Sequence, residues 1–168
     1  KEECDMPNWL ESMQQTFEYY IVDPNTWKDA KKLNFVKSSS IDRDEESDTL
    51  GSMSIDMDEN IGEAWIRVYL VTIQNGVKEK HPLGTYLVQT PSSSFDGKIR
   101  SVSMDAYTPL LELKENPPPL GYSILEGENV MQRASQLCRD HARAPVVEAP
   151  CEDVLKYDFV SNTNDNWL

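Results

Sequence analysis

The sequence predicts a mainly β (α+β) protein, with a small antiparallel β-barrel or sandwich module and then a helix that opens a second, incomplete module. Between residues 61 and 115, short segments rich in β-branched and alternating apolar residues follow one another at close spacing. Polar turn sequences such as Asn75-Gly76 and Asp96-Gly97 separate these segments. Only one long segment, Glu126–Ala142, has the 3.6-residue apolar period of a helix.

Three strands are predicted before residue 61, because aromatic, β-branched or alternating apolar residues recur there between polar turns. They are Thr16–Val22, Leu33–Ile41 and Leu50–Met57. Pro24 presets φ, and Asp23 and Asn25 can bond back to the backbone, so Asp23–Thr26 is expected to be a turn. Asn8–Met13 is expected to be a short helix or an irregular arm, and acidic residues dominate Asp42–Asp48.

The clearest predicted strand is Ala64–Ile73. It alternates, with Trp65, Arg67, Tyr69 and Val71 on one face and Ile66, Val68 and Leu70 on the other. The remaining expected elements of this part follow the chain after the Asn75-Gly76 hairpin turn. They are a return segment at Lys78–His81, a strand at Gly84–Thr90, a polar loop at Ser92–Gly97 and a strand at Lys98–Ala106.

The last third of the chain is predicted to be less regular. Tyr107–Lys114 is ambiguous, with a short helix after Pro109 as one solution. The helix Glu126–Ala142 is expected to turn Val130, Ala134, Leu137 and Cys138 inward. Two further segments are expected after it: an irregular stretch at Ala144–Pro150 and a strand or short helix at Asp153–Val160.

These elements predict four parts. They are an N-terminal arm at 1–15, an antiparallel β module at 16–115, a proline-rich linker at 116–121 around Pro117–Pro119, and the start of a second α+β module at 122–168. The chain starts with Lys, and Asn164–Leu168 resembles a cap followed by the first apolar residues of another element. The sequence is therefore expected to be a fragment of a longer protein.

Charge and hydropathy exclude several classes of protein. The net charge is −13, from 29 acidic and 16 basic residues, and the one short basic cluster lies between Lys28 and Lys37. Nucleic-acid binding by counterion release needs clustered Lys and Arg, so it is not expected. A transmembrane helix needs ~20 apolar residues, and no such run occurs. The acidity favours a surface that faces water or a basic partner.

No catalytic residue is predicted. The chain has two histidines, His81 beside Pro82 and His141 near a helix C-terminus, and both are expected to be structural or exposed. The sequence contains no Gly-x-Ser-x-Gly elbow and no glycine-rich phosphate loop. Carboxylates are numerous, but nothing identifies a catalytic pair. We therefore expect no cofactor and no enzymatic activity.

No metal site is predicted either. Cys4, Cys138 and Cys151 are too widely spaced for a zinc site, and free thiols are expected. The segment Asp56–Asn60 resembles the start of a calcium loop, but Ile61 and Arg67 occupy the positions that need Gly and a bidentate acid. A solvated turn is the preferred interpretation, although a looser site of oxygen ligands stays open.

Aromatic residues are concentrated in the first half of the chain. They suit either a small β core with anchors for a protein–protein interface or an exposed platform for carbohydrate, and the first is preferred. These residues are Trp9, Phe17, Tyr19, Tyr20, Trp27, Trp65, Tyr69 and Tyr86.

From residue 16 to 147 the order of segments resembles the tail-hub or baseplate hub proteins of tailed bacteriophages. The resemblance rests on three short patterns. They are Gly84, Thr85 and Val88 in LGTYLV; Val102, Ala106 and Tyr107 in VSMDAY; and Gly127, Asn129 and Val130 in GENV.

The resemblance implies a structural protein of the virion tail tip, made in the cytoplasm of a bacterial host. It implies a homo-oligomer, usually a trimer, that contacts tail-tube and tail-tip proteins. Two alternatives stay open: a carbohydrate- or receptor-binding β module of the tail tip, and the non-catalytic part of a tail-associated cell-wall hydrolase.

Overall fold

A computed structural model describes residues 7–95, 97, 100–162 and 164–168, and it is mainly β. Seven antiparallel strands form one sheet, in the order β2-β1-β5-β6-β7-β4-β3. Their bounds are β1 Gln14–Val22, β2 Asp29–Leu33, β3 Val36–Asp42, β4 Ser52–Met57, β5 Trp65–Gln74, β6 Val77–Phe95 and β7 Arg100–Tyr107. We call residues 14–107 the β module.

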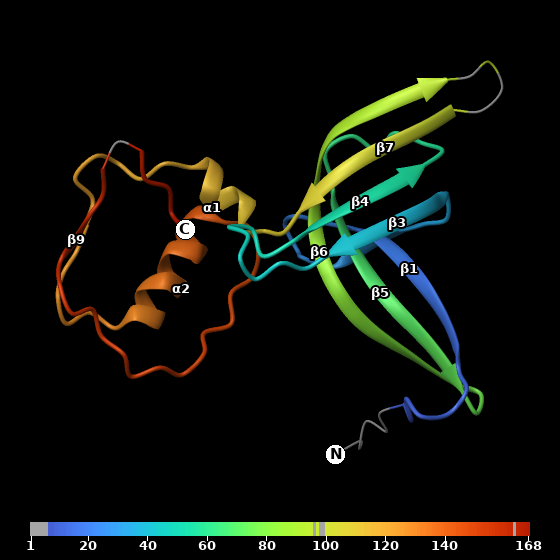
Figure 1. Cartoon of the computed structure of the whole chain (residues 1–168), viewed down its shortest axis with the longest axis horizontal. Coiled ribbons are helices and arrows are strands. Elements are labelled where there is room, and N and C mark those ends of the chain that lie inside the picture. The colour runs from blue at the N-terminus through green and yellow to red at the C-terminus, as the bar shows by residue number, and fades with distance from the viewer. Residues whose placement is uncertain (1–6, 96, 98–99, 163) are drawn as a thin grey trace.

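The sheet curls until its two ends face each other, as in a small sandwich (Figure 1). One half contains β2, β1, β5 and the first part of β6, and the other contains the end of β6 with β7, β4 and β3. The Tyr19 hydroxyl on β1 lies 2.6 Å from the Ser39 hydroxyl on β3, so the halves also meet through side chains.

Both halves contribute to one hydrophobic core. Ile66 and Val68 from β5 pack in the same cluster as Ile55 from β4 and Met104 from β7. The alternation predicted for β5 is confirmed, because Ile66 and Val68 enter this core while Arg67 and Tyr69 lie on the other face. The turn at Asn75-Gly76 is also confirmed, with positive φ at both residues and Gln74 paired with Val77.

Three details of the predicted strands are wrong. Leu33–Ile41 is not one strand, because the chain turns at Asn34-Phe35 between β2 and β3. Lys78–His81 and Gly84–Thr90 are joined in the single strand β6, whose register shifts absorb its bend. The expected polar loop at Ser92–Gly97 is strand as far as Phe95, because Ser92–Phe95 pairs with β7; Asp96 lies outside the described residues.

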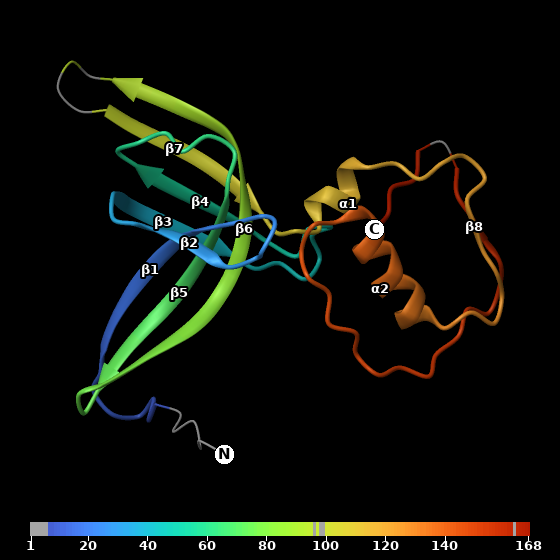
Figure 2. The same cartoon turned by 180° about the vertical axis from the view of Figure 1, so that it is seen from behind.

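The C-terminal region, residues 108–168, lies beside the β module and holds both helices (Figures 1 and 2). Helix α1 spans Leu111–Glu115 and helix α2 spans Val130–His141, while β8 (Ser123–Ile124) and β9 (Phe159–Val160) form a short antiparallel pair. Helix α2 starts four residues later than predicted, because the Asn129 side chain accepts a hydrogen bond from the Gln132 amide and caps it there.

The predicted inner face of α2 is also partly wrong. Ala134 and Val130 are exposed, whereas Ser135 is buried and Leu137 and Cys138 are half-buried. Among the described residues, no helix is long and apolar enough to cross a membrane.

Candidate functional site

The outer face of β2, β1, β5 and β6 carries a dense group of charged and aromatic side chains, which we call the lysine face. Strand alternation places them there, because residues two apart on one strand point the same way and the register aligns Glu18 with Tyr69 and Tyr20 with Arg67. Its members are Glu18, Tyr20, Asp29, Lys32, Arg67, Tyr69, Lys78 and Lys80.

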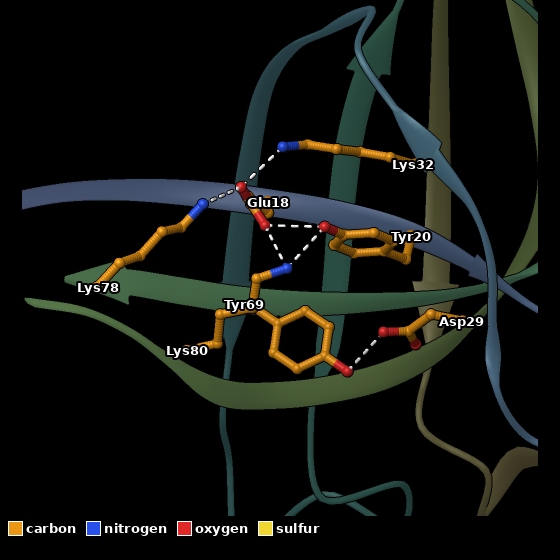
Figure 3. A network of polar contacts seen from close by, with 7 residues as sticks. All are labelled: Glu18, Tyr20, Asp29, Lys32, Tyr69, Lys78 and Lys80. Carbon is orange, nitrogen blue, oxygen red and sulfur yellow. Dashed lines mark hydrogen bonds and ion pairs between the residues drawn. The ribbon is translucent and has the colours of Figure 1, made fainter. Parts of the chain in front are cut away.

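Glu18 lies at the centre of the lysine face (Figure 3). Its Oε1 accepts hydrogen bonds from the ammonium groups of Lys32, at 2.7 Å, and Lys78, at 3.1 Å. Its Oε2 lies 2.6 Å from Lys80 Nζ and accepts from the Tyr20 hydroxyl at 2.9 Å. The Glu18 side chain is only 10% exposed because these neighbours cover it.

Electrostatics keep the Glu18 carboxylate and the Lys80 ammonium ionised at neutral pH. The hydrogen bonds from Lys32 and then from Lys80 hold the pKa of the Glu18 carboxyl well below its usual range, against the opposing effect of desolvation. The carboxylate of Glu18 and the hydroxyl of Tyr20 raise the pKa of Lys80 above its ordinary value. The Lys80 ammonium also lies 4.6 Å from the centre of the Tyr20 ring, a favourable cation–π distance.

A second group of bonds extends the lysine face across β1. Arg67 on β5 donates to Asp29 on β2 at 2.9 Å and to the Trp27 carbonyl at 3.1 Å. The Tyr69 hydroxyl donates to the other oxygen of Asp29 at 2.8 Å, and burial and this bond raise the pKa of Tyr69. Strand β2 is therefore attached to β5 although β1 lies between them.

The chemistry of the lysine face suits binding. It holds four cationic side chains and two carboxylates, and each carboxylate is engaged by cations or hydroxyls. Such an arrangement presents a positive surface on a chain whose net charge is −13. Only Lys32 comes from the basic cluster noted between Lys28 and Lys37; Lys78 and Lys80 come from β6.

The aromatic residues divide between core and surface. Tyr19, Trp65 and Tyr86 are buried, and Trp27 packs on Trp65 with ring centres 5.0 Å apart. Tyr20 and Tyr69 belong to the lysine face, and their rings meet edge to face at 5.6 Å. Trp9 and Phe17 are 53% and 56% exposed. Trp65 therefore belongs to the interior, not to an open platform for carbohydrate.

The two histidines lie in different parts of the molecule. His81 Nε2 is 3.2 Å from the Thr72 hydroxyl and 3.6 Å from a carboxylate oxygen of Glu79, within the β module. His141 ends α2 and stacks on Trp167, with ring centres 4.1 Å apart. The structure does not bring the two histidines together.

The predicted cysteines and the possible calcium loop form no metal site within the described residues. Cys138 and Cys151 are free and half-buried, burial raises the pKa of Cys138, and Cys4 lies outside the described residues. No group of three or more His, Cys, Asp or Glu residues that could hold a metal occurs in the part of the chain that the structure describes.

Asp56, the first acid of the calcium-like segment, lies in β4 between two serine-bearing strands. It accepts from Ser103 at 2.5 Å and from Ser38 at 2.7 Å, and these bonds lower its pKa. Asp58 pairs with Lys37 at 2.6 Å. These carboxylates are therefore used to link neighbouring strands.

Sequence reasoning missed the lysine face, although a signal for it exists. Glu18 and Tyr20 alternate on β1, Arg67 and Tyr69 on β5, and Lys78 and Lys80 on β6. Charged residues or tyrosines at alternating positions of three strands indicate a polar sheet face. What the sequence does not give is the register that brings Glu18 under three lysines.

A hollow lies where the β module meets the C-terminal region. It is a pocket of about 350 Å³ whose lining includes Val22, Trp65, Leu87 and Arg143. The Arg143 guanidinium lies 6.0 Å from the Trp65 ring centre, and its Nε donates to the buried carboxylate of Glu112 at 2.6 Å. Arg143 thus joins the two regions.

No protein-family model matches the chain, and no curated protein matches it.

Proposed function

We propose that the chain is a structural component of a phage tail tip, which assembles with copies of itself and with tail-tube proteins. The proposal rests on the three sequence patterns that resemble those of tail-hub proteins. The observation that supports it most is that residues of all three patterns bend a strand, fill the core or cap a helix.

The first pattern lies at the bend of β6. A Cβ atom at Gly84 would come within 2.7 Å of the Tyr86 side chain, so only glycine fits without a shift of that ring. The Thr85 hydroxyl accepts from Arg67 Nε at 3.0 Å, and Val88 is fully buried. The pattern therefore serves the curvature of the long strand and the core beneath it.

The second pattern contributes to the hydrophobic core, and the third pattern contributes a turn and a helix cap. Val102 and Ala106 on β7 are fully buried in the core. Gly127 has a φ of 84°, which favours glycine, and its amide donates to the Leu155 carbonyl at 2.9 Å. Asn129 caps α2 and also donates to the Cys151 carbonyl at 2.7 Å. Residues of the three patterns therefore determine the fold of the chain, which supports a structural function.

The measured mass of the chain in solution tests this proposal. We expect light scattering over a range of concentrations to show self-association, with a trimer as the smallest complete assembly implied by the resemblance. A chain that stays monomeric up to millimolar concentration would contradict the proposal.

Titration with cell-wall glycans separates assembly from carbohydrate binding. Trp65 is buried and Trp27 packs against it, which supports the assembly function over a sugar platform made from these residues. We expect tryptophan fluorescence to be unchanged by peptidoglycan fragments. A saturable change, lost in Trp9→Ala, would favour carbohydrate binding, because Trp9 is an exposed indole.

A further inference from the structure

The lysine face has unused capacity to bind carboxylates. An ammonium group has three donors. Within the described contacts, Lys32 and Lys78 each donate one hydrogen bond, both to Glu18. Their side chains are 43% and 51% exposed, so the remaining donors can reach a partner. Glu18 holds the lysines together on one surface (Figure 3) and so lowers the entropy that they would lose on binding.

This surface differs in sign from the molecule around it. The lysine face has four cations against two carboxylates, whereas the whole chain has 29 acidic and 16 basic residues. Two copies of such an acidic chain repel each other, and a contact between a positive surface of one copy and a negative surface of the other offsets this repulsion. The lysine face is suited to be the positive member of that contact.

The matching negative surface is the segment between β3 and β4. Five of the seven residues from 42 to 48 are acidic, and all five are exposed. Asp48 pairs with Lys114 at 2.8 Å, and Asp44 accepts from the Glu46 amide, so the segment has a defined shape. Within the described part of the chain, the carboxylates of Glu45 and Glu46 make no hydrogen bond or ion pair.

We propose that the lysine face of one copy binds the Asp42–Asp48 segment of a second copy, with Glu45 and Glu46 reaching Lys32 and Lys78. This inference deepens the proposed assembly function and rests on it. Each copy offers one of each surface, so head-to-tail repetition of the contact produces a closed ring or an open filament, and a reciprocal pair of contacts produces a two-fold dimer.

Charge reversal on each side of the contact tests the inference in the 168-residue chain at 0.15 M salt. Lys78→Glu and the double variant Glu45→Lys/Glu46→Lys are each expected to weaken self-association at least about tenfold, because close interfacial charge pairs couple by about 1.5 kcal/mol or more. The chain that carries all three substitutions should associate at least about tenfold more tightly than the Glu45→Lys/Glu46→Lys variant, because the introduced glutamate at position 78 attracts one of the two introduced lysines. Light scattering measures all four proteins.

Matched controls isolate the contact from overall charge. Lys31→Glu alters the neighbour of Lys32 on β2, where the side chain lies near Phe35 and away from Glu18. Glu126→Lys/Glu152→Lys makes the same charge change as the acidic-segment variant on exposed residues elsewhere. Neither control is expected to weaken association.

The possible results distinguish this inference from the function on which it rests. A monomeric wild type contradicts the assembly function itself. If both charge variants associate as strongly as the wild type, the docking inference is wrong and the assembly function still stands. A triple variant that associates no more tightly than the Glu45→Lys/Glu46→Lys variant also overturns it. If Lys78→Glu unfolds, which thermal unfolding shows, the Glu45→Lys/Glu46→Lys variant still decides, because that segment lies outside the Glu18 cluster.

Discussion

The β module and the C-terminal region are stabilised in different ways. In the β module, side chains from six strands enter one cluster, and Met57, Ile66, Val68, Val88 and Val102 are fully buried there. In the C-terminal region, several large apolar residues lie at the surface, with Leu120, Tyr157 and Val160 exposed by 75%, 80% and 56%. Its helix α2 buries only Ser135.

Hydrogen bonds replace much of the missing core in the C-terminal region. The chain from Asp153 to Ser161 runs beside residues 121–130 and exchanges backbone bonds with it, such as Leu155 N to the Glu128 carbonyl. Glu112 accepts two bonds from Arg143, and Trp167 stacks on His141. Because bonds of this kind contribute only about 1 kcal/mol each, we expect this region to open before the β module.

The largest expected effect is a cavity in the core of the β module. Val88→Ala removes two buried methyl groups, so it should lower the free energy of unfolding by about 2.5 kcal/mol in a urea titration. Val77→Ala is the matched control, because Val77 lies on the same strand but is 59% exposed, and it should change stability by less than about 0.5 kcal/mol. Equal effects at both sites would mean that Val88 does not belong to a closely packed core.

The next effect comes from Glu18 and depends on pH. Glu18→Gln removes the charge that three lysines share, and we expect a loss of about 2 kcal/mol at pH 7, reduced by the partial exposure of the lysines. The folded pKa of Glu18 lies below its unfolded value of 4.5, so its contribution is complete above that pH and is lost as the pH falls below it.

Thermal unfolding from pH 7 to pH 2 measures this dependence. The wild type should lose stability more steeply below pH 4.5 than Glu18→Gln, and the two curves should converge in acid. Glu59→Gln, an exposed acid in the bend after β4, is the control and should follow the wild type. Parallel curves for the wild type and Glu18→Gln would show that the lysines do not stabilise the carboxylate.

The strands of the β module were the most predictable part of the fold. Alternation is a local property, so β5 and the Asn75-Gly76 turn follow directly from sequence. The length of β6 does not, because Ser92–Phe95 reads as a polar loop and is strand only through pairing with β7. The break at Asn34-Phe35 does not follow from sequence either. β2 and β3 lie at opposite ends of the strand order and pair with different strands, so the chain cannot continue as one strand there.

The candidate site was less predictable than the fold. Glu18, Lys32 and Lys78 are separated by 14 and 46 positions in the sequence, and three strand registers bring them together. The start of α2 was misplaced for a related reason. The helix was expected to begin at Glu126, whereas Asn129 caps it and α2 begins at Val130, and no periodicity reports this single capping bond.

In the C-terminal region, Glu112→Gln should act locally. The Glu112 carboxylate accepts from the Arg143 amide at 2.8 Å and from its guanidinium at 2.6 Å, which joins α1 to the end of α2. Gln keeps the shape but loses the charge, so we expect about 1.5 kcal/mol less protection of the α2 amides in hydrogen exchange. Glu115→Gln, an exposed acid on the same helix, is the control.

The amides of the β module report whether the two regions unfold separately. If they do, Glu112→Gln leaves the protection of β5 and β6 unchanged, because their core includes no residue after Ala106. An equal loss of protection in β5 would instead mean that the two regions unfold as one cooperative unit, and the proposed difference in stability would then be wrong.

The smallest expected effect comes from Asn129, whose side chain makes two hydrogen bonds that two substitutions can distinguish. Asn129→Ala removes both the cap of α2 and the bond to the Cys151 carbonyl, and it should cost about 1 kcal/mol in the C-terminal region. Asn129→Asp keeps an acceptor for the Gln132 amide but removes the donor to Cys151. If capping dominates, Asp should restore most of the α2 protection measured by hydrogen exchange. If the aspartate behaves like alanine, the bond that ties α2 to the returning chain is the more important one, and tertiary contacts, not helix capping, determine where this region begins to open.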